Sequence, residues 1–298
     1  MARGLQMISN AWAGPRSGRI ARAGILFGAL LLPLVASAAP QIRSGAALVI
    51  DHHGHRLFER HADEPRPIAS ITKLMTAMVV LDAEVPLEDR VTITEQDRDR
   101  LRHSRSRLRI DQATLSRADL LRVSLLSSDN RAAAALGRTT FAGGTPAFVT
   151  AMNAKAQTLG MRSSVFADAS GLDGGNRASP EDLVRLLHAA ARYPFIREVT
   201  STSEFIAQPY ADGSTLEYRN TNPLVRDPRW VVEISKTGYL NEAGRCLVMQ
   251  AQIAGRRLYI VLLDAAGQMT PMADANRLRD WLAAGGDQRA AAVAVRAR

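Results

Sequence analysis

Only three of the 38 basic residues in this 298-residue chain are lysines, and two of these lie in short polar motifs that could carry chemistry. Lys73 follows Ser70 by three positions, and Lys236 opens the triplet Lys236-Thr237-Gly238. A buried lysine can lose its proton and act as a base, whereas a guanidinium stays protonated at any ordinary pH. The two motif lysines are therefore the first candidates for a catalytic role. Lys155 lies in an ordinary amphipathic stretch and is expected to be a surface or packing residue.

Ser70 and Lys73 would share one face of a helix, close enough for a neutral lysine to take the hydroxyl proton. Burial and a second cation such as Lys236 would both lower the pKa of Lys73. A positioned base contributes about 10² to 10⁴-fold in rate. The plainer interpretation of a serine at this place is a helix N-cap, and Ser-x-x-Lys alone is weak evidence of catalysis.

Two further motifs follow in the chain. Ser128-Asp129-Asn130 lies in a helical pattern, where Ser128 could relay a proton and Asn130 could orient a substrate amide. Lys236-Thr237-Gly238 follows a strand-like run, Val231 to Ser235, so its side chains can alternate along a substrate while glycine permits close backbone approach. Each triplet alone would be a polar turn. Together and in this order, the three motifs match those of penicillin-binding proteins and serine β-lactamases.

The chain resembles the D-alanyl-D-alanine endopeptidases, short low-molecular-mass penicillin-binding proteins of the D-Ala-D-Ala carboxypeptidase group of serine peptidases. The resemblance extends from about Ser44 to Leu282. The stretches most similar to that subgroup are Pro67 to Leu81, Leu101 to Leu108, Met152 to Met161 and Ser235 to Met249.

The resemblance implies an α/β (α+β) fold of the transpeptidase type, with an antiparallel sheet flanked by helices and a helical subdomain across the active-site cleft. It implies that Ser70 is the acylated nucleophile, Lys73 its proton acceptor and Ser128 a proton relay to the leaving amine. It implies no metal and no cofactor. The implied substrate contacts are Asn130, Lys236, Thr237 and Gly238, with Lys236 and Thr237 on the carboxylate side, and the backbone N–H groups of Ser70 and Tyr239 would form the oxyanion hole.

Hydrophobic patterning predicts the elements that position these motifs. The expected strands are Ser44 to Asp51, Arg56 to Arg60, Thr202 to Gln208, Trp230 to Ser235, Arg245 to Ile253 and Arg257 to Asp264. The expected helices are Ile71 to Asp82, Arg117 to Gly137, Pro146 to Leu159, Pro180 to Arg192 and Met272 to Ala284. This order predicts an α/β catalytic domain built from residues 39–85 and 201–285, a helical subdomain over 86–200 and a flexible tail over 286–298.

The first 38 residues predict a secretory signal peptide. They contain four arginines and no acidic residue, then an apolar run from Ala23 to Val35, then Ala36-Ser37-Ala38 as a cleavage site. The run is shorter than the roughly 20 residues of a spanning helix and contains Pro33, which favours cleavage over an uncleaved anchor. Cleavage would lower the formal net charge from +9 to +5. We therefore expect a periplasmic protein that acts on the anionic cell wall, with no nucleic-acid partner.

Three other features have plain interpretations. Cys246 is the single cysteine, which excludes an intramolecular disulfide, and its apolar flanks predict a buried strand residue. The histidines from His52 to His55 are expected in a solvated hairpin turn, with a metal site as the alternative. The basic run from Arg102 to Arg109 is expected in a solvated loop or, alternatively, as an electrostatic guide for an anionic substrate.

The predicted function is a serine D,D-endopeptidase that hydrolyses D-Ala-diaminopimelate crosslinks in peptidoglycan and is acylated by β-lactams at Ser70. The neighbouring alternative is a D-Ala-D-Ala carboxypeptidase. A class A-like β-lactamase needs a Glu-x-x-Asn stretch in the helical block, and the only candidate nearby is Glu217 to Asn220, which is outside that block. A catalytically silent wall-binding protein is a further alternative. The stretch after Leu282 has no apolar stripe, so we expect no stable membrane anchor.

Overall fold

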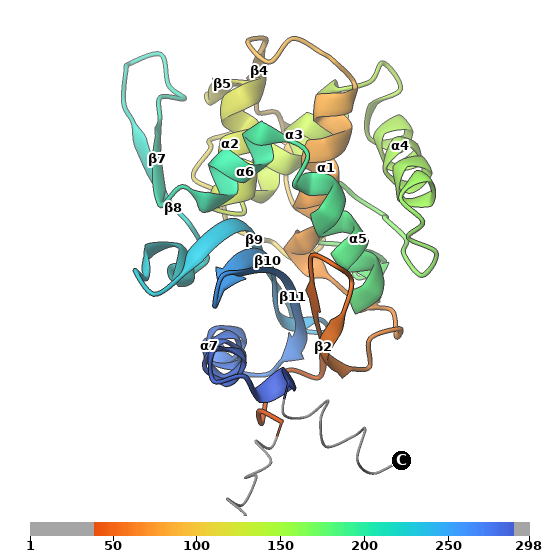
Figure 1. Cartoon of the computed structure of the whole chain (residues 1–298). Helices are drawn as coiled ribbons and strands as arrows, with labels where there is room; N and C mark the ends of the chain where they lie inside the picture. The colour runs from red at the N-terminus through yellow and green to blue at the C-terminus, as the bar shows by residue number, and fades with distance from the viewer. Residues whose placement is uncertain (1–38, 289–298) are drawn as a thin grey trace, which may run out of the picture. The chain divides into compact units, whose positions relative to one another are not determined.

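A five-stranded antiparallel sheet forms the centre of the computed structural model, which describes residues 39–288 (Figure 1). The strand order is β2-β1-β11-β10-β9. The strands are β1 (Ala46–Asp51), β2 (Arg56–Arg60), β9 (Val231–Leu240), β10 (Gly244–Ile253) and β11 (Arg256–Ala265). Because β1 pairs with β11, both ends of the chain contribute to one sheet, and β9 is left as an edge strand. The predicted signal peptide, residues 1–38, and residues 289–298 of the predicted tail are outside the described residues.

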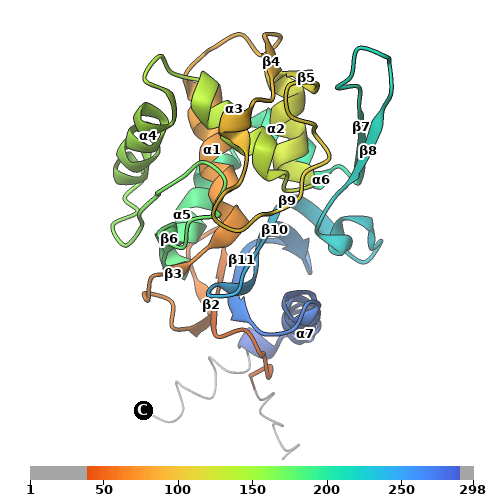
Figure 2. The ribbon, with the colours of Figure 1, turned by 180° about the vertical axis from the view of Figure 1, so that it is seen from behind.

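Alternate residues of the central strands face two separate cores, as strand geometry requires. Leu48, Val248 and Val261 face one core together with α1 and α5, while Val49, Met249 and Ile260 face the other together with α7. Figures 1 and 2 show α7 on one side of the sheet and the remaining helices on the other. The helices are α1 (Thr72–Asp82), α2 (Arg117–Leu126), α3 (Asn130–Thr139), α4 (Gly144–Thr158), α5 (Pro180–Ala190), α6 (Pro194–Ser201) and α7 (Thr270–Ala283).

Among residues 39–288, three short antiparallel pairs lie outside the main sheet. They are β3 (Arg66–Pro67) with β6 (Arg177–Ala178), β4 (Arg90–Thr92) with β5 (Thr114–Ser116), and β7 (Glu204–Ala207) with β8 (Leu216–Arg219). Local capping defines several helix starts: the side chains of Ser116 and Ser179 accept the backbone N–H groups of Asp119 and Asp182, and Pro180 begins α5.

The predicted helix over Arg117 to Gly137 is wrong, because the chain forms two helices with a break at Ser127–Asp129. Ser128 has a φ of 65°, in the left-handed region that a helix cannot contain. Asp129 then caps α3 by accepting the Ala132 N–H at 3.0 Å. The motif serine thus projects from a turn between helices.

Other differences are smaller. Strand β9 continues through Lys236-Thr237-Gly238 to Leu240 instead of ending at Ser235, and α6 and β8 are additional to the predicted elements. Residues 86–116, expected in the helical block, contain β4, β5 and long loops. Asp287 in the predicted tail pairs with Arg256 at 2.7 Å. None of the helices between residues 39 and 288 is long and apolar enough to span a lipid bilayer.

Candidate active site

Ser70 lies on a short 3₁₀ turn, Ala69–Ile71, immediately before α1. Its backbone is packed between two glycines. A Cβ on Gly171 would lie 2.0 Å from the Ala69 carbonyl oxygen, and a Cβ on Gly238 would lie 3.1 Å from the Ser70 nitrogen. Gly171 also has a φ of +80°. These two close approaches hold the nucleophile candidate against β9. The N-cap interpretation of Ser70 is wrong, since neither the 3₁₀ turn nor α1 has a side-chain cap.

Lys73 is in the first turn of α1 and is completely buried. Its Nζ lies 2.8 Å from Ser70 Oγ, 2.7 Å from Asn130 Oδ1 and 2.5 Å from the Ser170 carbonyl oxygen. Burial lowers the pKa of Lys73 to about 8, although the carboxylates of Asp168 and Asp129 oppose that shift. With this pKa about a tenth of Lys73 is neutral at pH 7, which supplies the free base that proton transfer from the Ser70 hydroxyl requires.

Lys236 is also buried, and its Nζ lies 2.9 Å from both Ser128 Oγ and the Thr237 carbonyl oxygen. Burial lowers the pKa of Lys236 well below its usual range, and the positive charge of Lys73 lowers it further. The sequence predicted that Lys236 would depress the pKa of Lys73. In the structure the low pKa of Lys73 comes from its own burial, and the repulsion between the two cations acts on Lys236.

Asn130, the first residue of α3, connects Lys73 to the loop before α2. Its Nδ2 donates to Ser104 Oγ at 2.9 Å while its Oδ1 accepts from Lys73. Asp129 is buried and accepts from Ser106 Oγ at 2.7 Å. Ser104 lies in the family-like stretch Leu101 to Leu108, but the sequence did not predict a role for it in the site. Only the fold brings this loop to the site.

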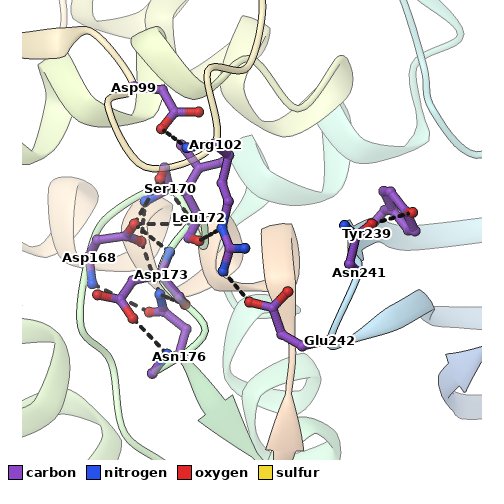
Figure 3. A network of polar contacts seen from close by, with 11 residues as sticks. Asp99, Arg102, Asp168, Ser170, Leu172, Asp173, Asn176, Tyr239, Asn241 and Glu242 are labelled. Atoms are coloured by element: carbon purple, nitrogen blue, oxygen red, sulfur yellow. Dashed lines mark hydrogen bonds and ion pairs between the residues drawn. The ribbon is translucent and has the colours of Figure 1, made fainter.

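The loop from Asp168 to Asn176 was not identified from the sequence as part of the site. Asp168 organises this loop: its carboxylate accepts the backbone N–H groups of Ser170, Leu172 and Asp173 at 3.0, 3.2 and 3.0 Å, and that of Gly171 (Figure 3). Asn176 Nδ2 donates to the same carboxylate at 3.0 Å. This loop conformation places the Ser170 carbonyl oxygen 2.5 Å from Lys73 Nζ.

Arg102 joins three segments beside the site (Figure 3). Its guanidinium donates to the Leu172 carbonyl at 3.3 Å and pairs with Glu242 in the turn between β9 and β10. Further along the basic run, Arg107 and Arg109 stack on the rings of Tyr218 and Tyr210. These arginines are therefore held by specific contacts at the surface, beyond what the solvated-loop interpretation predicted.

A pocket of about 400 Å³ opens over Ser70. Six residues predicted from the sequence line it: Ser70, Ser128, Asn130, Thr237, Gly238 and Tyr239, with Lys73 and Lys236 buried beside them. Thr237 Oγ1 lies 2.6 Å from the hydroxyl of Thr221, which also lines the pocket. The sequence did not predict the remaining lining residues, Pro223, Arg245, Cys246, Gln268, Met269, Pro271 and Met272.

Cys246 is buried on β10, as predicted, and burial raises the pKa of its thiol to about 12. The stretch from Glu217 to Asn220 is on and just after β8, and Glu217 is not among the pocket-lining residues. His52 and His53 lie in the turn between β1 and β2. In the part of the chain that the structure describes, no group of three His, Cys, Asp or Glu side chains is arranged to hold a metal ion.

Comparison with known proteins agrees with this geometry. Residues 34–267 match the family model described as D-alanyl-D-alanine carboxypeptidase. The D-alanyl-D-alanine endopeptidase of Escherichia coli is 42% identical over 83% of this chain and 79% of its own length. That of Pseudomonas aeruginosa is 44% identical over 82% and 79%. The structure of the Streptomyces K15 DD-transpeptidase superposes with a TM-score of 0.74 at 27% identity, over 81% of this chain and 97% of that one. The predicted transpeptidase-type fold is thereby confirmed.

Proposed function

The chain belongs to the D-alanyl-D-alanine carboxypeptidase family of peptidases, and from this premise we propose that it is a serine D,D-endopeptidase that hydrolyses D-Ala-diaminopimelate crosslinks in peptidoglycan. The observation that carries the proposal is the 2.8 Å contact between Ser70 Oγ and the fully buried Lys73. The preference for crosslinks is supported by two relatives that are 42% and 44% identical and are named D-alanyl-D-alanine endopeptidase.

In the proposed acylation, neutral Lys73 takes the Ser70 hydroxyl proton as Oγ attacks the carbonyl carbon of the D-alanine residue. The backbone N–H groups of Ser70 and Tyr239 stabilise the oxyanion of the tetrahedral intermediate. The C–N bond then breaks as Ser128, held by Lys236, relays to the leaving amine the proton that Lys73 took from Ser70, so that Ser128 keeps its hydroxyl and Lys73 is neutral again. Asn130, Thr237 and Gly238 position the substrate along the edge strand. Water hydrolyses the resulting ester and restores Ser70.

β-Lactams fit the same scheme as acylating inhibitors. Attack of Ser70 on the lactam carbonyl opens the ring, and the amine that leaves remains tethered to the acyl group. Because it cannot diffuse away, it stays in the place that the hydrolytic water needs. We expect a long-lived penicilloyl ester on Ser70.

The proposed location is the periplasm. The signal peptide at residues 1–38 would direct export and then be cleaved. A formal charge of +5 after cleavage suits a substrate in the anionic cell wall, and the proposed partners are peptidoglycan stems and crosslinks.

The proposal is tested by incubating the purified protein with crosslinked muropeptide dimers and, separately, with pentapeptide monomers. Chromatography of the products should show dimers converted to monomers by the wild type and unchanged dimers with Ser70→Ala. Loss of terminal D-alanine without dimer cleavage would refute the endopeptidase assignment and leave the carboxypeptidase alternative. Hydrolysis of neither peptide would contradict both.

The loop around Asp168 gives a separate prediction. Asp168→Asn removes the charge and part of the acceptor capacity that six hydrogen bonds from the loop use, so the Ser170 carbonyl should lose its fixed position. We expect acylation by a fluorescent penicillin to slow by about 10-fold or more and the unfolding free energy to fall by about 2 kcal/mol. Because the Asp168 carboxylate raises the pKa of Lys73, the acylation pH profile should also shift below its wild-type midpoint.

Asp173→Asn is the matched control, since the Asp173 carboxylate accepts only the Gly175 N–H in the same loop. Its pH profile should match that of the wild type. A wild-type pH midpoint in Asp168→Asn would mean that Asp168 acts on stability alone.

A further inference from the structure

Three exposed arginines occupy alternate positions in the loop between β4 and β5. They are Arg105, Arg107 and Arg109, called here the arginine ridge. The residues between them face the protein interior: Ser106 Oγ donates to Asp129 at 2.7 Å, and Leu108 is buried. None of the three arginines lines the pocket over Ser70. The ridge is therefore fixed beside the motif Ser128-Asp129-Asn130 but has no part in the proposed mechanism.

Two of the ridge guanidiniums have fixed positions. That of Arg107 lies 4.5 Å from the centroid of the Tyr218 ring and donates to the Glu217 carbonyl oxygen. That of Arg109 lies 4.8 Å from the centroid of the Tyr210 ring. Tyr210 is in the turn between β7 and β8, and Tyr218 is on β8, so this hairpin supports the ridge. Because the two arginine side chains are already ordered, they lose less conformational entropy when a ligand binds.

The charges of the ridge are not neutralised within the protein. Among residues 39–288, none of its three arginines forms an ion pair. Their side chains donate to neutral oxygens, those of the Glu217 backbone and the Gln112 side chain. The Asp212 carboxylate is close enough to feel the charge of Arg109, but the two form no ion pair. The earlier arginines of the same loop differ, since Arg98, Arg100 and Arg102 all pair with glutamates.

The chemistry of the ridge suits an anionic polymer. Unpaired guanidiniums bind carboxylates or phosphates, and several in a row favour a chain that repeats such groups. Peptidoglycan is such a polymer, because its stem peptides carry free carboxylates at intervals along the glycan. An anionic lipid surface is the other candidate. Lipid binding also uses apolar side chains, however, and the exposed side chains between residues 105 and 109 are all arginines.

We propose that the arginine ridge binds the carboxylates of stem peptides that neighbour the crosslink held at Ser70. The ridge would thus be a second contact with the polymer, outside the pocket that holds the reacting bond. Two linked contacts bind a polymer more tightly than one contact binds a soluble fragment. The assignment rests on the proposed function, because that function brings peptidoglycan to this face of the protein.

The test measures binding of the Ser70→Ala protein to isolated sacculi by cosedimentation, at low and at high salt. Adding Arg105→Gln, Arg107→Gln and Arg109→Gln should weaken binding about 10-fold at low salt and reduce its salt dependence. The matched control adds Arg162→Gln, Arg192→Gln and Arg197→Gln, which remove the same charge from exposed arginines that also form no ion pair. It should bind nearly as Ser70→Ala does. Unchanged binding by the ridge variant, or equal losses in both variants, would overturn the proposal.

A single substitution covers the case in which loss of the tyrosine contacts disturbs the β7–β8 hairpin. Arg105→Glu leaves those contacts in place and reverses one charge of the ridge. In the Ser70→Ala background it should weaken binding to sacculi about 5-fold, while Arg162→Glu should not. Equal binding by these two variants would contradict a contact between Arg105 and the polymer.

Vesicles of phosphatidylglycerol and phosphatidylethanolamine in equal parts test the lipid candidate. Tighter binding to these vesicles than to sacculi, lost in the ridge variant, would assign the ridge to a membrane and overturn the proposal. Because binding to sacculi needs no hydrolysis, its specific loss in the ridge variant supports the ridge even if the wild type cleaves no muropeptide. Cleavage of sacculi with no effect of the ridge substitutions on rate or binding refutes the ridge and leaves the proposed function intact.

Discussion

Ser70→Ala is expected to abolish labelling by a fluorescent penicillin and to lower crosslink hydrolysis by about 10⁴-fold or more. The reason is that the hydroxyl is the only group proposed to form the covalent bond, and Lys73 is held 2.8 Å from it. The substitution removes one oxygen and leaves the backbone packing against Gly171 and Gly238 unchanged, so the fold should be retained.

Labelling is followed by gel fluorescence and by intact mass, and thermal unfolding checks the fold. Ser163→Ala is the matched control, because Ser163 is exposed and does not line the pocket. It should be labelled at the wild-type rate. Normal labelling of a folded Ser70→Ala protein would remove the basis of the proposed mechanism.

Lys73→Arg is expected to slow acylation by about 10³-fold or more, even though it keeps the positive charge. A guanidinium cannot accept the Ser70 proton, and its larger head must enter a completely buried site that already has three acceptors around the ammonium group. Lys236→Arg should slow acylation less. The contacts of Lys236 with Ser128 and Thr237 are donations that a guanidinium can also make.

The pH dependence of acylation by the wild type is a second test of Lys73 as the base. The pKa of Lys73 is about 8. Below pH 8 the neutral fraction of Lys73 therefore rises nearly tenfold with each unit of increasing pH, and above pH 8 it levels off. The acylation rate should follow this curve. Stopped-flow penicillin labelling between pH 6 and 9.5 measures it. A flat profile, or equal losses in Lys73→Arg and Lys236→Arg, would contradict Lys73 as the base.

The strands could be predicted and the three motifs recognised from the sequence, because both depend on residues that are close together in the chain. Runs of apolar residues define β1, β10 and β11 to within two residues at each end, and the spacing of Ser70 and Lys73 is a property of one helical turn. The family itself was recognisable from three short motifs. The break at Ser128 was not predicted, because its positive φ opposes the helical pattern of the residues on both sides.

The tertiary structure alone decided which groups surround the reacting atoms. Lys73 meets the Ser170 carbonyl across 97 positions of the chain, and Lys236 meets Ser128 across 108. No periodicity encodes such pairs, since they depend on how the sheet, the helices and the loop from Asp168 to Asn176 pack together. The same packing buries both lysines, and burial, which no local pattern specifies, sets the direction of their pKa shifts. The sequence thus determined the reactive residue types, and the packing determined their proton affinities and the shape of the pocket beside them.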